Sequence, residues 1–325
     1  MKIVFMGTPE YAVPSLRQLI AHHDVVAVCT QPDRRAGRGH KLQMSPVKAL
    51  ALEAGITVLQ PETLRIKKAP VGDAEIQSNK EAKEIRSYLA NLEADIFVVA
   101  AYGIILPKAV LDIPRLGSIN VHASLLPKYR GASPIHSAIK NGDTVTGITI
   151  MYMDVGIDTG DMILHRELTI DPDERTPSLH DRMAELGGEC IIEAIAMFEA
   201  GTATRMPQDD SISSYAPMIK KTDGHIRWDW PTDRIVNLIR AFDPWPGAYS
   251  LYKNDVIKIW RLEKVGMIED AVPGMVLAVD AGRGFLVKTG DGGAWIAEVQ
   301  AAGKKRMTAK DYLLGHEVRV GEILG

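Results

Sequence analysis

The chain has 325 residues, a length that allows two domains, each with a hydrophobic core of its own. Its composition, 46% hydrophobic and 24% charged with a net charge of −3, is typical of a globular protein and does not mark it as a nucleic-acid binder. The two cysteines, Cys29 and Cys190, are too few for a metal site. Because no apolar run reaches about 18 residues and no signal or transit peptide opens the chain, we expect a reduced, metal-free, cytoplasmic protein.

The first two hundred residues alternate between strand and helix patterns. Strands are expected at residues 2–6, 25–30, 56–59, 95–101 and 147–153, and helices at 14–22, from 46, from 134 and from 176 to about 199. This alternation predicts an α/β fold with a Rossmann-like, mostly parallel sheet and helices on both faces. The most apolar strand, 95–101, should lie at its centre. Ligands of such sheets bind beyond the carboxyl ends of the strands.

Residues 64–92 carry a further helical pattern. Ser78 and Glu81 have the spacing of a capping box, and Ala82, Ile85 and Leu89 follow at helical intervals. We expect a surface helix that begins near Ser78 and has a solvated, charged outer face.

After about Met206 the pattern changes to short β-rich pieces at 248–252, 256–262, 276–278, 285–289 and 294–300. Several are separated by turns that contain glycine, which is typical of a small antiparallel barrel. A barrel of five such strands is compatible with an OB-like fold, a common oligonucleotide platform. We therefore expect a Rossmann-like domain over residues 1–206 and an OB-like domain over residues 207–325.

The chemistry is concentrated in the run INVHASLLPKYRGASPI, residues 119–135, and in MDVGIDTGDM, residues 153–162. If a strand ends here, the two-residue spacing puts the side chains of Asn120 and His122 on the same side of it. Asp158 lies on a loop flanked by glycines that could bring a carboxylate beside the imidazole. An amide donor, an imidazole and a carboxylate are the groups that acyl transfer without a covalent intermediate requires.

Together with AAYGIILP at 100–107 and QPDRRAGRG at 31–39, these motifs resemble those of the folate-dependent formyltransferases. The resemblance implies direct transfer of the formyl group of 10-formyltetrahydrofolate to an amine, through a tetrahedral intermediate. Asn120 would donate to the oxyanion, His122 would handle the proton or stabilise the oxyanion, and Asp158 would favour the charged imidazole. The resemblance also places the folate against Gly103, Ile104, Ile105, Leu106, Ser124, Leu125, Leu126 and Pro127.

Two basic clusters point to the acceptor. The resemblance implies that the basic loop contacts initiator methionyl-tRNA, with Arg38 as the main recognition residue. The expected tRNA-binding residues are Arg34, Arg35, Arg38 and Lys41 in this loop, and Lys304, Lys305 and Arg306 near the C-terminus. The protein is expected to be a monomer.

Two alternatives remain open from the sequence. A formyltransferase that acts on an amino sugar nucleotide would share Asn120, His122 and Asp158, but would lack the basic loop and the C-terminal basic cluster. A non-catalytic RNA-binding protein on the same scaffold would have no need of all three polar side chains. Taken singly, the N-x-H pair and the Asp-Thr-Gly turn are also compatible with structural roles.

Overall fold

The computed structural model describes residues 1–36, 41–268 and 270–325. The described residues divide into two compact units. Unit 1 comprises Met1–Gly131, Thr146–Leu168 and His180–Tyr215, and unit 2 comprises Ala132–Val145, Thr169–Leu179 and Ala216–Gly325. Unit 2 therefore takes two short segments from the middle of the sequence in addition to the C-terminal part.

Unit 1 is built on a sheet that has seven strands among the described residues. They are β1 (Lys2–Gly7), β2 (Asp24–Cys29), β5 (Val58–Leu59), β6 (Ile96–Ala100), β7 (Ser118–His122), β9 (Val145–Tyr152) and β10 (Met162–Thr169). The spatial order is β10-β9-β7-β6-β1-β2-β5, so the most apolar strand, β6, lies at the centre as predicted. Strands β5, β2, β1, β6 and β7 pair in parallel, and β9 runs antiparallel to β7. The carboxyl ends of the parallel strands therefore share one edge.

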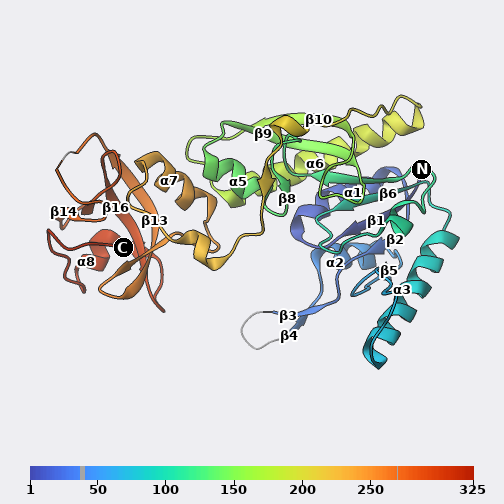
Figure 1. Ribbon diagram of the computed structural model, residues 1–325, viewed down its shortest axis with the longest axis horizontal. Helices are drawn as coiled ribbons and strands as arrows, with labels where there is room; N and C mark the ends of the chain where they lie inside the picture. Colours follow the sequence, from blue (N-terminus) through green and yellow to red (C-terminus); the bar gives the residue numbers. More distant parts are fainter. Residues whose placement is uncertain (37–40, 269) are drawn as a thin grey trace. The chain divides into compact units, whose positions relative to one another are not determined.

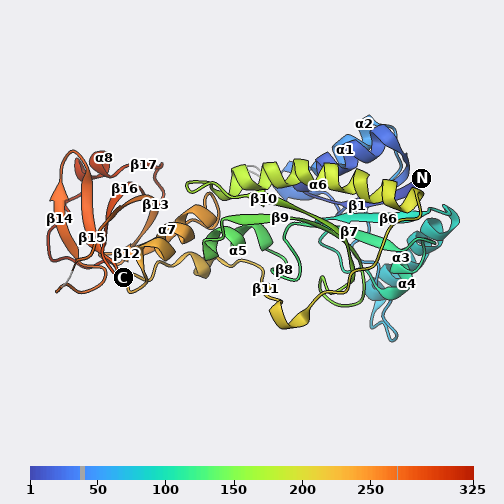
Figure 2. The same ribbon diagram turned by 90° about the horizontal axis from the view of Figure 1, so that it is seen from above.

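Helices cover both faces of this sheet (Figures 1 and 2). On one face lie α1 (Val13–His22), α2 (Pro46–Glu53) and the part of α6 (Thr176–Glu199) that belongs to unit 1, and on the other lie α3 (Asp73–Asn91) and α4 (Lys108–Leu111). All five residues of β6 are buried, because a strand covered on both sides has no solvent face. Phe97 and Val99 of β6 pack with Leu89 of α3 and Leu111 of α4 in one apolar cluster. The predicted α/β fold is confirmed.

The starts of α2 and α6 agree with prediction. The Oγ of Ser45 accepts a 3.1 Å hydrogen bond from the amide of Lys48, as an N-cap does. The predicted capping box at Ser78 is wrong, because α3 begins five residues earlier, at Asp73. The carboxylate of Glu75 in the first turn accepts a 2.8 Å hydrogen bond from the amide of Val71, which ties the preceding loop to the helix.

Unit 2 is an antiparallel β domain with associated helices. Its strands are β12 (Tyr249–Tyr252), β13 (Asp255–Val265), β14 (Val276–Asp280), β15 (Gly284–Lys288), β16 (Gly293–Ala301) and β17 (Met307–Thr308). The strand order is β12-β13-β16-β15-β14, and β17 pairs with β16. The helices of this unit include α5 (Pro134–Asn141), α7 (Thr232–Ala241) and α8 (Ala309–Leu313). The predicted C-terminal antiparallel β domain is confirmed.

The remaining elements are short. They are η1 (Glu10–Ala12), β3 (Arg34–Ala36), β4 (Lys41–Gln43), β8 (Arg130–Gly131), η2 (Asp210–Ile212), β11 (Tyr215–Ala216) and η3 (Lys221–Gly224). No helix among the described residues is both long and apolar enough to cross a membrane.

Candidate active site

Strand β7 delivers two of the three predicted catalytic side chains to the carboxyl edge of the sheet. Asn120 and His122 are two residues apart on the strand, so both project from the same side, as expected. The neighbouring strand β9 fixes their register, since Asn120 pairs with Met151 and His122 with Thr149. Both side chains therefore start from a rigid, buried element.

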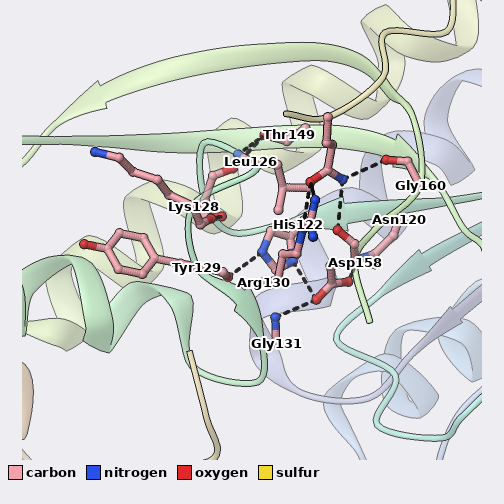
Figure 3. Close-up of polar contacts among 12 residues, drawn as sticks. Asn120, His122, Leu126, Lys128, Tyr129, Arg130, Gly131, Thr149, Asp158 and Gly160 are labelled. Carbon is pink, nitrogen blue, oxygen red and sulfur yellow. Dashed lines mark hydrogen bonds and ion pairs between the residues drawn. The ribbon is translucent and has the colours of Figure 1, made fainter. Parts of the chain in front are cut away.

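The imidazole of His122 is buried and held by a backbone carbonyl. Its Nε2 lies 3.0 Å from the carbonyl oxygen of Tyr129, and a carbonyl can only accept, so Nε2 carries a hydrogen. Nδ1 lies 3.6 Å from the Oδ2 of Asp158 (Figure 3). In the neutral ring the lone pair is therefore on Nδ1, and a proton gained there faces a carboxylate.

Asp158 reaches the site from the loop between β9 and β10. Its φ of 52° lies in the left-handed region, an uncommon conformation for a residue other than glycine. Its Oδ2 accepts a 2.8 Å hydrogen bond from the amide of Gly131, and its Oδ1 lies 3.5 Å from the Nδ2 of Asn120. The three predicted catalytic residues thus meet at one point, from two segments of unit 1.

The backbone of this loop is clamped by Gln208, a residue that sequence reasoning missed. The Nε2 of Gln208 donates to the carbonyl oxygens of Asp158, at 2.9 Å, and Gly160, at 2.7 Å. Its Oε1 accepts from the Nε and Nη2 of Arg130, at 3.0 and 2.8 Å. Gly160 is required here, because a Cβ at that position would lie 1.9 Å from the carbonyl oxygen of Tyr152. No local motif marks Gln208, since its partners lie 48, 50 and 78 positions away in the sequence.

The segment after His122, expected to line the folate site, is tied together by its own hydrogen bonds. The Oγ of Ser124 donates to the carbonyl of Lys128 at 2.6 Å. The hydroxyl of Thr149 donates to the carbonyl of Ser124 at 2.7 Å and accepts from the amide of Leu126 at 3.1 Å. Ser124, Leu126 and Pro127 are buried and Leu125 is half-buried. These contacts give the loop one defined conformation next to the imidazole.

The other expected folate-binding residues follow the central strand. Leu106 is buried and Ile104 packs partly against the core, whereas the side chain of Ile105 is 63% exposed. Gly103 has a φ of 77°, and a Cβ there would lie 2.2 Å from the Nε2 of Gln31. That amide donates to the carbonyl of Tyr102 at 2.9 Å. The carboxyl ends of β2 and β6 are thereby joined, and Ile105 is left as an apolar surface beside them.

The two basic clusters have different surroundings. Arg34, Arg35 and Lys41 belong to a hairpin of β3 and β4, and the side chain of Arg34 is exposed, whereas Arg38 lies outside the described residues. In unit 2, Lys304 and Lys305 are exposed. Arg306 is engaged within its unit: its Nη2 donates to Asp243 at 2.8 Å, and its guanidinium lies 4.1 Å from the ring centroid of Trp260.

Unit 1 thus places an amide, an imidazole and a carboxylate together at the carboxyl edge of its sheet. These are the groups that an enzyme of acyl transfer requires. The sequence family described as Formyl transferase matches residues 1–195, and the one described as Formyl transferase, C-terminal domain, matches residues 218–317. The chain belongs to the formyl transferase family.

Curated relatives match over the whole length. The chain is 46% identical to the methionyl-tRNA formyltransferase of Caldanaerobacter subterraneus over 325 residues and 47% identical to that of Ruminiclostridium cellulolyticum over 328 residues, with 100% of each chain covered. Solved structures share the fold at lower identity. An N-formyltransferase from Helicobacter canadensis, in complex with folinic acid and dTDP-3-aminofucose, has a TM-score of 0.63 and 21% identity, with 94% of this chain and 100% of that chain covered. HypX from Aquifex aeolicus, in complex with tetrahydrofolic acid, has a TM-score of 0.57 and 17% identity, with 99% of this chain and 50% of that chain covered.

Proposed function

We propose that the protein transfers the formyl group of 10-formyltetrahydrofolate to the α-amino group of methionine on initiator methionyl-tRNA. The observation that carries this proposal is full-length identity of 46–47% to enzymes named for that activity, in a chain whose amide, imidazole and carboxylate meet at the carboxyl edge of the sheet. The reaction would take place in the cytoplasm, with the protein acting as a monomer.

The residues of the site divide the chemistry between them. As the amine attacks the formyl carbon, the carbonyl oxygen becomes an oxyanion, and the Nδ2 of Asn120 is the group that can donate to it; such a donor contributes about 10²–10³ in rate. The proton lost by the amine passes to the Nδ1 of His122 or to Asp158, through water where the distance requires it. It then returns to the departing N10 of the folate as the C–N bond breaks, so no residue of the protein is acylated.

The tautomer of His122 supports this division of roles. With its Nε2 hydrogen held by the carbonyl of Tyr129, the ring has a basic nitrogen on the side of Asp158. A proton accepted there would lie on the nitrogen that is 3.6 Å from the carboxylate, without any movement of the ring.

The folate would lie against the exposed side chain of Ile105, the Gly103 backbone and the segment from Ser124 to Pro127. An apolar wall next to backbone polar groups suits a flat heterocycle with several donors and acceptors. The catalytic part, residues 1–206, would thus bind the formyl donor. Residues 207–325 would contribute to tRNA binding through Lys304 and Lys305, together with Arg34, Arg35, Arg38 and Lys41 of the catalytic part. Arg306 would join them while its Nη2 is bound to Asp243, because the side chain is 41% exposed.

The test is an acceptor comparison with the purified full chain and 10-formyltetrahydrofolate. We expect formylation of initiator methionyl-tRNA, much less formylation of elongator methionyl-tRNA, and none of a dTDP-amino sugar. Formylation of the sugar nucleotide without formylation of either tRNA would overturn the proposal. Binding of tRNA without formylation of any acceptor would instead support the non-catalytic alternative.

A further inference from the structure

A hollow of about 380 Å³ lies entirely within unit 2, among residues that the mechanism does not use. It is bordered by the C-terminal end of α5, by residues 222–230 and by α7. Helices α5 and α7 are neighbours in both views of the molecule (Figures 1 and 2). The volume is in the range of sites that hold small molecules or single polymer units.

An arginine stacked on a tryptophan forms one wall of this hollow. The guanidinium carbon of Arg234 lies 3.8 Å from the ring centroid of Trp230. Arg234 is exposed and forms no ion pair with a carboxylate among the described residues. Nearby Asp229 already binds Arg227, at 2.8 Å. The ring therefore holds the guanidinium flat, while its N–H edge stays open to a ligand.

A second cation, Lys140, borders the hollow from a different helix, α5. Lys140 is exposed at the end of α5 and likewise has no ion pair within the described part of the chain. The acidic residue in the lining is Asp223, whose carboxylate accepts a 2.8 Å hydrogen bond from the amide of Lys220. Because Arg227 is paired with Asp229, the cations of the lining without an ion pair to a described residue are Lys140 and Arg234; they outnumber Asp223, so the hollow carries an excess of positive charge.

We propose that this hollow binds the sugar-phosphate backbone of RNA, with Arg234 as a bidentate donor to one phosphate and Lys140 as a charge partner for a neighbouring one. Two exposed cations on separate helices suit a polyanion with regularly spaced charges, because each phosphate that they neutralise releases its counterions. The identification of this RNA as the tRNA substrate rests on the proposed function. The site lies outside both of the basic clusters seen in the sequence.

Unit 2 contains a matched control for the stack. Arg283 also lies over a tryptophan, with its guanidinium carbon 4.7 Å from the ring centroid of Trp295, but it forms an ion pair with Glu263 at 3.3 Å. Arg283→Ala therefore removes the same charge and the same kind of stack as Arg234→Ala. It does so at a position where a carboxylate already neutralises the arginine.

The experiment measures binding of initiator tRNA to the full chain between about 50 and 300 mM KCl. We expect Arg234→Ala and Lys140→Ala each to weaken binding roughly three- to tenfold near 100 mM salt and to reduce the slope of log K against log[salt] by about 0.7–0.9, the release from one phosphate. Arg283→Ala should change neither, and Arg234→Lys should keep the slope but lose part of the affinity. Thermal melting of each variant excludes loss of folding as the cause.

Equal effects of Arg234→Ala and Arg283→Ala, or an unchanged salt slope in Arg234→Ala, would overturn the inference. A third outcome would also overturn it: inorganic phosphate, added at matched ionic strength, abolishes the difference in tRNA affinity between wild type and Arg234→Ala. The hollow would then be a site for a free anion. The salt slope could differ between wild type and Arg234→Ala while the wild-type protein formylates no methionyl-tRNA. That result would leave this inference standing and overturn the proposed function instead.

Discussion

Two aspartates, one in each unit, show how neighbouring groups decide what a carboxylate can do. The side chains of Asp158 and Asp243 are similarly buried, 18% and 11% exposed. Asp158 accepts from one backbone amide and faces His122, whose charge changes with its proton. Asp243 is bound by the guanidinium groups of Arg175 and Arg306. The first carboxylate can respond to a proton transfer, whereas two permanent charges hold the second.

Burial of a carboxylate is therefore a poor guide to its role. A carboxylate that faces neutral donors and a single titratable ring can take part in proton transfer. A carboxylate that is bound by two arginines stabilises the fold instead. Substitution at Asp158 should therefore reduce turnover while the fold is kept, and substitution at Asp243 should reduce stability while turnover is kept.

The largest effect is expected for Asp158→Asn. Asparagine keeps the acceptor for the Gly131 amide but removes the charge opposite His122, so turnover should fall by about 10²–10⁴, with the free energy of unfolding within about 1 kcal/mol of wild type. His122→Ala should lose a similar factor. Steady-state formylation and urea unfolding check both. The control is Asp161→Asn, the same change on the same loop at a carboxylate that pairs with Arg205, 3.3 Å away. Equal turnover in the two asparagine variants would contradict the assignment.

Asp243→Asn should show the opposite pattern. It leaves two guanidinium groups without their shared counter-charge, and because both arginines are partly exposed we expect a loss of about 1–3 kcal/mol in unfolding free energy. Turnover well below the melting temperature should stay within about twofold of wild type. Asp233→Asn, at an exposed pair with Lys264, is the control and should cost less than about 1 kcal/mol. A loss of turnover without a loss of stability in Asp243→Asn would erase the distinction between the two aspartates.

Gln208→Ala tests how the loop of Asp158 is positioned. It removes the amide that donates to the carbonyls of Asp158 and Gly160, and turnover should fall about tenfold, with a smaller change in KM. Gln208→Glu keeps an acceptor for Arg130 but lacks the donor, so it should be as impaired as alanine. Gln300→Ala removes a comparable amide-to-carbonyl bond in unit 2 and is the control. Full activity in Gln208→Glu would mean that the pairing with Arg130, not the clamp on the loop, matters.

Much of the fold and of the site could be read from local patterns. The two-residue spacing of Asn120 and His122 is enough to put them on one side of a strand, because side chains alternate along it. The helix start at Ser45 is a local signal of the same kind. The capping-box pattern at Ser78 misses the start of α3, since the helix already begins at Asp73 and its Glu75 accepts a hydrogen bond from the amide of Val71.

The rest depends on contacts between distant segments. Gln208 reaches Asp158 across 50 positions, and Arg306 reaches Asp243 across 63, so no sequence window contains either pair. For Arg234 the limit applies in part: Trp230 is four positions away in the sequence, but Lys140, on another helix, is 94 positions away (234 − 140). Sequence pattern thus identifies the residues that carry the chemistry more readily than those that hold them in place.

A third carboxylate, Glu322, is intermediate between Asp158 and Asp243, because one permanent charge, that of Lys253, is bound to it. Its substitution should give the smallest effect. It accepts from the hydroxyl of Tyr252, from the amide of Arg319 at 3.0 Å and from the Nζ of Lys253 at 2.9 Å, and these bonds lower the pKa of its carboxyl to about 2. Because the folded pKa is below the ordinary value near 4.5, its stabilising contribution is complete above about pH 4.5 and is lost as the pH falls toward 2. Urea unfolding at pH 6 and pH 3.5 should therefore show a smaller acid-induced loss in Glu322→Gln than in wild type. An identical loss in the two proteins would mean that this carboxylate, despite its three donors, is no more tied to folding than a solvated one.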